Sequence, residues 1–167
     1  MGLTLFDKIW KNHFVGCRED GRELLYIDRH VVHDLHAPHA FKELARQNRE
    51  VRRKDLTVVV QDHTVATRHD IAVASENMRA TQQACHDHKV MLIDHRSPQH
   101  GISHIISVEQ GWALPGKTLA CPDSHASTVG ALGCLAFGCG TTELVHILAT
   151  QTMALMKPQQ MRVLLTG

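Results

Sequence analysis

The chain has 167 residues, and its 18 Lys and Arg against 17 Asp and Glu give a formal net charge of +1. This length suits one domain with its own hydrophobic core, and the near-neutral charge provides no basic field that would bind nucleic acid or anionic lipid. The content of 43% hydrophobic and 21% charged residues is typical of a globular protein and excludes a disordered one.

Three features of the sequence predict a protein of the reducing cytoplasm that does not enter a membrane. The first thirteen residues carry Asp7, Lys8 and Lys11 where a secretory signal needs an apolar run. The five cysteines are odd in number and lack the spacing of a disulfide framework. The longest uncharged stretch, 126–142, is too rich in glycine and small residues for a membrane span.

The first half of the chain predicts alternating helices and strands. A short amphipathic helix follows Thr4, which is a suitable N-cap, and an apolar strand covers 24–27. Pro38 opens the next helix, because proline is favoured in the first helical turn. The β-branched run at 57–60 is typical of a strand buried on both faces, and residues 71–88 predict a helix.

The second half continues the alternation. Residues 90–93 repeat the buried-strand pattern, and 118–120 predict a fourth strand. The apolar segment 102–108 between them is too short to distinguish helix from strand. A glycine-spaced stretch then leads into a helix that begins at residue 141 or 142 and runs to 156, and 162–165 predict a closing strand.

This order of elements predicts the fold class. Strands that alternate with helices at this spacing indicate an α/β domain, a three-layer sandwich with a largely parallel central sheet and helices on both faces. A closing strand that runs directly into the C-terminus has no cap and no following helix. We therefore expect the chain to be a fragment of a longer protein.

Four of the predicted strands are followed by a carboxylate and an imidazole. The pairs are Asp28 with His30, Asp62 with His63, Asp94 with His95, and Asp123 with His125. Ligands of open α/β sheets bind outside the carboxyl ends of the strands. An aspartate that accepts a hydrogen bond from an imidazole fixes its tautomer and raises its basicity, as proton transfer requires. The repeated pattern predicts either acid–base chemistry or metal ligation at this edge.

The same residues also have a structural interpretation. An aspartate after a strand often caps the next helix or bonds within its own turn. Asp28 with Arg29 is typical of a scaffold pair, and Asp94 is typical of a cap. The pairs at 62–63 and 123–125 are better candidates for a site, because strongly apolar or glycine-rich sequence surrounds them.

A group of three histidines suggests a metal cluster at first sight. His33, His36 and His39 recur at a spacing of three, but Pro38 stands between the last two and breaks a single helical face. A solvated, histidine-rich turn is the favoured interpretation.

The histidines further along the chain differ in their surroundings. His86 and His88 lie on a polar helix end and are predicted to be at the surface. His104 stands among apolar neighbours, so its ring needs a partner. It is either a core histidine with a satisfied ring or a residue of the site.

The glycine-rich stretch at 130–140 has neither the glycine spacing nor the lysine of a nucleotide-binding loop. Its predicted use is close backbone packing behind the Asp123-Ser124-His125 turn. Cys134 and Cys139 lack a Cys-x-x-Cys spacing, so a metal site built from the thiolates of this chain alone is disfavoured.

Together these segments resemble the large subunits of the 3-isopropylmalate dehydratases, a family of the aconitase superfamily. The matching motifs, in chain order, are LYIDRH with His33, QDH at 61–63, GISH at 101–104 with EQG at 109–111, DSH at 123–125, and GCGTTE at 138–143 with HILATQT at 146–152. Only the first domain of that subunit is matched. The resemblance therefore implies one aconitase-like α/β domain over residues 1–167, a fragment of a longer large subunit.

The resemblance implies an enzyme, a hydro-lyase that isomerises 2- and 3-isopropylmalate by dehydration and rehydration in leucine biosynthesis. By their positions, Asp62 and His63 resemble the pair that handles the departing or returning hydroxyl, and His104 resembles a histidine supported by an aspartate. The implied catalytic residues are Asp62, His63, His104, Asp123 and His125. The implied substrate-binding residues are His33 and Ser124.

The same resemblance implies a cofactor and partners. Family members hold a 4Fe-4S cluster through three cysteines of a later domain, so the cluster is expected in the full-length enzyme, with no cofactor or metal held by this chain alone. The implied substrate is a small hydroxy-dicarboxylic acid. The base that removes the carbon-bound proton comes from a swivelling domain, which in these enzymes is a separate small subunit.

Two positions depart from the family pattern. Pro122 replaces the usual glycine before the Asp-Ser-His turn, and Ala126 stands where threonine is common. Proline fixes its own φ and removes a backbone donor at the turn that directs Ser124. The alternative interpretation is a stand-alone, cluster-free module that uses the same crevice to bind a small carboxylic acid or a divalent metal.

Overall fold

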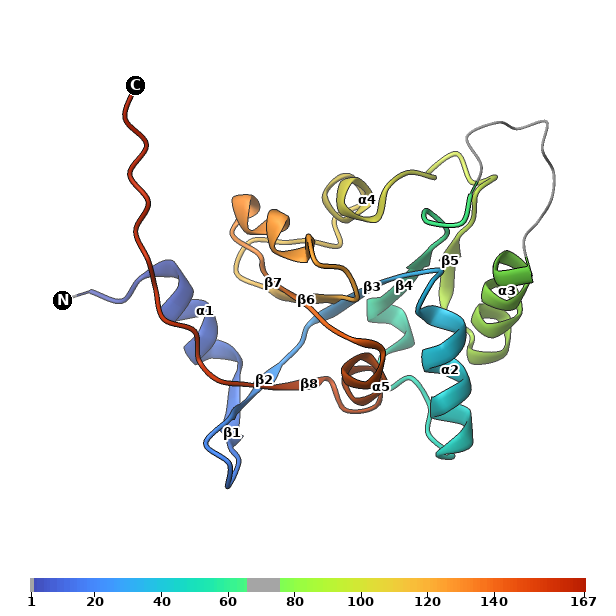
Figure 1. The fold of residues 1–167 in the computed structure, drawn as a ribbon, viewed down its shortest axis with the longest axis horizontal. Coiled ribbons are helices and arrows are strands. Elements are labelled where there is room, and N and C mark those ends of the chain that lie inside the picture. The colour runs from blue at the N-terminus through green and yellow to red at the C-terminus, as the bar shows by residue number, and fades with distance from the viewer. Residues whose placement is uncertain (1, 66–75) are drawn as a thin grey trace.

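A five-stranded parallel sheet forms the centre of the fold (Figure 1). The computed structural model describes residues 2–65 and 76–167 of the chain. In sheet order the strands are β5 (Met91–Ile93), β4 (Thr57–Val60), β3 (Arg29–His33), β6 (Thr118–Cys121) and β7 (Leu135–Gly138). Every neighbouring pair is parallel, so all carboxyl ends meet at one edge.

Helices cover both faces of this sheet. The helices α2 (Ala37–Arg46), α3 (Glu76–His88) and α5 (Thr141–Thr150) lie on one face (Figure 1). The helix α4 (Ser103–Glu109) and the 3-10 helix η2 (Ala126–Leu132) lie on the other face. The predicted three-layer α/β sandwich is confirmed.

Neighbouring residues of one strand belong to different cores. Val31 packs in the same buried cluster as Ile106 of α4, whereas Val32 packs in the cluster that contains Phe41 of α2. All four side chains are at most 1% exposed. Because both faces of the sheet are covered, a strand such as 57–60 is a continuous apolar run and does not alternate with polar residues.

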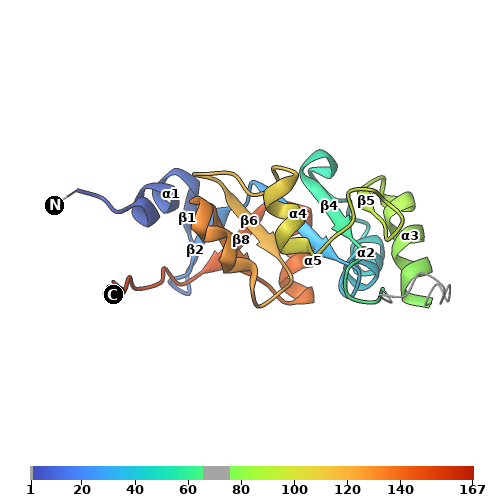
Figure 2. The same cartoon turned by 90° about the horizontal axis from the view of Figure 1, so that it is seen from above.

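A smaller antiparallel sheet lies at one end of the molecule, opposite α3 (Figure 2). Its strands are β1 (Phe14–Cys17), β2 (Glu23–Tyr26) and β8 (Thr152–Leu155). The helix α1 (Leu5–His13) lies beside it, and the Thr4 hydroxyl caps the first turn, as predicted. A 3-10 turn, η1 (Lys54–Leu56), leads into β4.

Two strands of the main sheet were missed by the sequence analysis. The central strand β3 has polar residues at both ends and only two valines between them, so it lacks a recognisable apolar run. Asp28 does follow the predicted strand, which is β2 of the smaller sheet, but it also directly precedes β3. His30 lies within β3 and does not follow a strand. The strand β7 was missed because it lies within the glycine-rich stretch at 130–140, which was not predicted to form a strand.

The last part of the chain also differs from the prediction. Helix α5 ends at Thr150 and not at 156, because Gln151 adopts a left-handed backbone with φ of 62°. The following residues pair with β2 as β8. Residues 162–165 form no regular element and are exposed, so the predicted closing strand is wrong.

The two remaining helix predictions have separate outcomes. The ambiguous segment 102–108 forms helix α4 from Ser103 onward. In the predicted helix 71–88, residues 76–88 form α3, and residues 71–75 lie outside the described residues. Within residues 2–65 and 76–167, no helix is both long and apolar enough to cross a membrane.

Candidate functional site

The predicted site residues gather at the carboxyl ends of β3, β4 and β6. His33 ends β3, the pair Asp62–His63 follows β4, and the turn 123–125 follows β6. The chain leaves β3 toward β4 on one side and later returns to β6 on the other side, so the strand order reverses here. Such a switch point is where open α/β sheets bind ligands.

Asp62 holds the ring of His63 and is itself anchored by α4. The Nδ1–H of His63 donates to Asp62 Oδ1 at 2.7 Å. The other carboxylate oxygen accepts from the Ser103 N–H at 2.7 Å and from the Ser103 hydroxyl at 2.5 Å. The Asp62 side chain is 3% exposed, whereas that of His63 is 33% exposed. The ring is therefore fixed at Nδ1 and open at Nε2.

Asp123 joins the two predicted pairs into one cluster. Its Oδ1 lies 3.0 Å from Nε2 of His104 and 3.3 Å from Nδ1 of His125, and its Oδ2 lies 3.6 Å from Nε2 of His63. The backbone N–H of His125 also donates to Oδ1 at 2.7 Å. The structure thus brings together the residues that the sequence placed on separate strands. The sequence left His104 as either a core histidine or a residue of the site. Its ring has a carboxylate partner in the cluster.

The charges of the cluster change the protonation of its members. Burial lowers the pKa of His63, but the hydrogen bond and charge of Asp62, together with the charges of Asp34 and Asp123, outweigh burial and place this pKa above its ordinary value. Burial raises the pKa of Asp123, but hydrogen bonds from His125 and His104 outweigh burial and place this pKa below its ordinary value. The cluster therefore favours an imidazolium at His63 beside a carboxylate at Asp123.

His33 and His36 do not form the solvated turn that the sequence favoured. His33 is 1% exposed, its Nε2–H donates to the Pro122 carbonyl at 2.6 Å, and its ring stacks on His63 with centroids 4.0 Å apart. His36 is half-buried with its ring 4.6 Å from that of His33, and only His39 is exposed. Burial lowers the pKa of both His33 and His36.

The 123–125 turn depends on a glycine behind it. A Cβ at Gly138 would lie 2.7 Å from the Asp123 carbonyl oxygen, a contact that side chains do not make. The predicted backbone packing behind this turn is therefore confirmed at Gly138. Ser124 is exposed, with its hydroxyl 3.3 Å from Nδ1 of His125, and Pro122 contributes its carbonyl to His33.

The other two Asp/His pairs have structural contacts. Asp28 accepts from the Thr118 N–H at 2.9 Å, and Asp94 accepts from the Arg96 N–H two residues later. Asp28 matches the predicted scaffold role, whereas Asp94 caps no helix and bonds within its own turn. His30, by contrast, is fully buried within β3.

Three residues near the site were missed by the sequence analysis. Ser103 anchors Asp62, Asp34 bonds the loop that carries His63, and Gln61 is buried with its amide donating to the Met78 carbonyl. Only Gln61 and Ser103 carried a signal, since each precedes a predicted site residue. Asp34 follows a strand that was not recognised.

The cysteines do not fit the ligands of an iron–sulfur cluster. Cys85 is buried on the α2 face of the sheet, Cys121 and Cys134 are buried on the α4 face, and Cys17 lies on β1. Burial raises the pKa of Cys85 and Cys139 to about 12, which opposes thiolate formation. Among the described residues, therefore, no group of three thiols lies together beside the Asp/His cluster.

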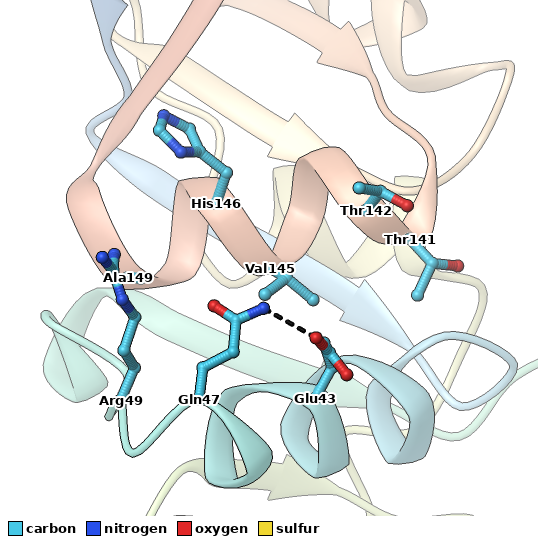
Figure 3. A pocket seen from close by; sticks show the side chains of 8 residues that line it. All are labelled: Glu43, Gln47, Arg49, Thr141, Thr142, Val145, His146 and Ala149. Carbon is cyan, nitrogen blue, oxygen red and sulfur yellow. Dashed lines mark hydrogen bonds between the residues drawn. The ribbon is translucent and has the colours of Figure 1, made fainter.

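A hollow lies on the face of the main sheet away from α4. It has a volume of about 400 Å³ between α2 and α5 (Figure 3). The carboxylate that lines this hollow belongs to Glu43, and it already accepts hydrogen bonds from Arg46 and Gln47. The candidate chemistry therefore belongs to the Asp/His cluster and not to this hollow.

Comparison with known proteins identifies relatives of the whole chain. The sequence profile of the aconitase family (aconitate hydratase) matches residues 7–167. The 3-isopropylmalate dehydratase large subunit of Bacillus cereus (strain G9842) is 44% identical over 172 aligned residues, which cover 100% of this chain and 37% of that relative. The large subunit of the same name from Staphylococcus epidermidis (strain ATCC 12228 / FDA PCI 1200) is 43% identical, with coverage of 100% and 38%. The chain thus spans less than two fifths of the length of these relatives.

Proposed function

Because the chain belongs to the aconitase family, we propose that it is the first α/β domain of a hydro-lyase large subunit. The proposed reaction interconverts 2- and 3-isopropylmalate by removing and returning a hydroxyl on adjacent carbons, as in leucine biosynthesis. The names of the relatives and their greater length support this proposal. The chain is proposed to be one domain over residues 1–167 of a longer polypeptide, and its free cysteines suit a reducing cytoplasm.

The observation that carries the proposal is that, in the described part of the chain, the His63 ring is held by a hydrogen bond at only one of its two nitrogens, Nδ1. Asp62 holds Nδ1 and the raised pKa favours the protonated ring, while Nε2 has its closest described carboxylate at 3.6 Å and the side chain is 33% exposed. Nε2–H can then protonate a leaving hydroxyl as a general acid and take the proton back from water in the reverse direction. Asp62 and His63 together are the proposed hydroxyl-handling pair.

The other cluster residues are proposed to bind and orient the substrate. The rings of His104 and His125 both contact Oδ1 of Asp123, which sets their orientation. Ring N–H groups in this position can donate to the carboxylates of a small hydroxy-dicarboxylic acid. Ser124, exposed at the turn, and His33, beneath the His63 ring, are proposed on the substrate side.

Two parts of the proposed reaction lie outside this chain. A 4Fe-4S cluster, which in this family supplies a Lewis acid for the substrate oxygens, would be held by cysteines of the remaining polypeptide, because the cysteines here do not fit. The base for the carbon-bound proton is proposed to come from a small subunit with a swivelling domain. Anaerobic reconstitution of the 167-residue chain is therefore expected to leave no stoichiometric iron and sulfide.

A second candidate function is a cluster-free module that binds a divalent cation. His104, Asp123 and His125 each offer one ligand atom, and these atoms lie within 4.8 Å of one another. Imidazole and carboxylate are suitable ligands for zinc. This candidate predicts stoichiometric Zn²⁺ binding that does not require any further protein.

One experiment separates the two candidates. The complete large subunit and its small subunit are produced together, and the interconversion of 2- and 3-isopropylmalate is measured with and without the small subunit. Conversion that requires both proteins supports the hydro-lyase. Absence of conversion, with tight 1:1 Zn²⁺ binding to the 167-residue chain by calorimetry, supports the cation-binding module instead.

A further inference from the structure

A buried aspartate lies beneath the loop that carries His63. Asp34 follows β3 directly and is 0% exposed. Its backbone N–H donates to the Val60 carbonyl at 3.0 Å, which continues the pairing of β3 with β4 by one residue. The carboxylate is therefore fixed at the point where β4 passes into the His63 loop.

Both oxygens of Asp34 accept hydrogen bonds from this loop. The His63 N–H donates to Oδ1 at 3.1 Å, and the Thr64 N–H donates to Oδ2 at 3.0 Å. The Thr64 hydroxyl also donates to Oδ2. Two consecutive backbone donors of the loop thus share one carboxylate, so the backbone of His63 cannot shift without breaking charge-assisted hydrogen bonds.

Asp34 is connected in turn to α3. The Asn77 side-chain amide donates to the Asp34 carbonyl at 3.0 Å. Asp34 therefore links three parts of the fold: the end of β3, the loop after β4, and the first turn of α3. A link of this kind transmits the rigidity of the sheet to the loop.

His63 is consequently restrained at two points. Asp62 fixes its ring at Nδ1, and Asp34 fixes its backbone. We propose that Asp34 is a positioning residue that sets where Nε2 of His63 lies in the Asp/His cluster. This inference rests on the proposed hydro-lyase function, in which that nitrogen carries the transferred proton.

The charge of Asp34 adds a second effect on the same ring. Asp34, Asp62 and Asp123 all face His63 and favour its protonated form, while His33 stacks on it. The substitution Asp34→Asn removes this charge. It also replaces one acceptor oxygen with an NH₂ group, which cannot accept from a backbone N–H. One substitution therefore tests both position and charge.

The direct test is Asp34→Asn in the 167-residue chain with ¹⁵N-labelled histidine, followed by NMR titration of the His63 ring. The pKa of His63 is expected to fall, because one facing carboxylate is lost. Asp94→Asn is the matched control, since Asp94 also follows a strand and accepts one backbone N–H. The control is expected to leave the His63 titration unchanged.

The functional test uses the complete large subunit with its small subunit. Asp34→Asn is expected to lower kcat about 10- to 100-fold with KM within about twofold, as a displacement of about 1 Å does when it affects the transition state alone. Thr64→Val keeps the Asp34 charge and both N–H donors, so it tests position alone. We expect it to lower kcat about three- to tenfold.

The outcomes separate positioning from simple stabilisation. A lower melting temperature for Asp34→Asn with a parent-like His63 titration and parent-like kcat overturns the proposal. Should Asp34→Asn not fold, a parent-like kcat for Thr64→Val overturns it. If the parent enzyme shows no isopropylmalate conversion, the proposed function fails, while the NMR comparison still decides whether Asp34 controls His63.

Discussion

Two aspartate–histidine pairs with the same close contact lie at opposite ends of the main sheet. At the amino ends of β3 and β6, Nε2 of His13 lies 2.7 Å from Oδ2 of Asp28. At the carboxyl end of β4, Nδ1 of His63 lies 2.7 Å from Oδ1 of Asp62. The contact distance alone therefore does not distinguish a scaffold pair from a candidate catalytic pair.

The second ring nitrogen distinguishes the pairs. Nδ1 of His13 is also committed, 2.7 Å from the Ile9 carbonyl oxygen, and the side chain is only 9% exposed. Nε2 of His63 has its closest described carboxylate at 3.6 Å, and the side chain is 33% exposed. A ring held at both nitrogens fastens α1 to the sheet, whereas a ring held at one nitrogen can exchange a proton with a ligand.

The largest expected effect concerns the open ring. In the complete enzyme, His63→Asn is expected to reduce kcat about 10²- to 10⁴-fold, the usual loss for a general acid or base. Its melting temperature is expected to stay close to that of the parent, since the ring is partly exposed. Steady-state kinetics beside thermal melts measure both. A strongly lowered melting temperature with near-normal turnover would make His63 a structural residue like His13.

A third histidine extends the comparison to a fully buried ring. The Thr57 hydroxyl donates to the Arg53 carbonyl, so it accepts from Nδ1–H of His30. Among the described residues, Nε2 of His30 has no hydrogen-bond partner. Burial lowers the pKa of His30 to about 3. This ring therefore stays neutral in the folded protein well below pH 6.

His30 is expected to make the fold sensitive to acid. Between pH 6.5 and about 3 the unfolded chain binds a proton at this residue and the folded chain does not, so stability falls as pH falls through this window. The loss is about 3 kcal/mol by pH 4. Urea unfolding at several pH values is expected to show a weaker acid dependence for His30→Leu, in which Thr57 keeps its bond to Arg53. An unchanged slope would exclude this origin, and exposed His39→Gln is the control.

Substitution in the scaffold pair His13–Asp28 is expected to lower stability and leave turnover unchanged, the opposite of the effect expected for His63. Asp28 accepts from His13 and Thr118, and burial, which raises its pKa, is outweighed by those hydrogen bonds so that the pKa lies below its ordinary value. Asp28→Asn is expected to cost about 1 to 3 kcal/mol in urea unfolding, with kcat of the complete enzyme within about twofold. A large loss of turnover without loss of stability would contradict the assignment. Asp94→Asn is the control.

The sequence predicted the layers of the fold and the gathering of the Asp/His cluster because both follow from local patterns. Apolar runs at 57–60 and 90–93 identified strands, and parallel strands place their following residues at one edge. The prediction failed for β3, where Arg29, His30 and His33 interrupt the apolar pattern. Arg29 and His33 find their hydrogen-bond partners far along the chain, at the Gly111 and Pro122 carbonyls.

The contacts that define the site are also non-local, which limited what the sequence could predict. Ser103 lies 41 residues from Asp62, and Asp34 lies 29 residues from His63. No spacing rule connects such positions before the sheet order is known. For the same reason, His33 was assigned to a solvated turn although its ring is buried under His63.

The smallest expected effect compares two neighbouring histidines that the sequence treated alike. The side chain of His86 is 85% exposed, whereas the half-buried His88 stacks on Phe41 with ring centroids 4.8 Å apart, and burial lowers its pKa. His88→Asn is therefore expected to cost about 0.5 to 1.5 kcal/mol of unfolding free energy, and His86→Asn no more than about 0.5 kcal/mol. Both variants of the complete enzyme are expected to keep parent-like turnover, because α3 contributes no ring to the cluster. Equal stabilities in urea would show that the stacked ring contributes nothing. A loss of turnover in His88→Asn alone would place part of the chemistry on the face of the sheet opposite α4.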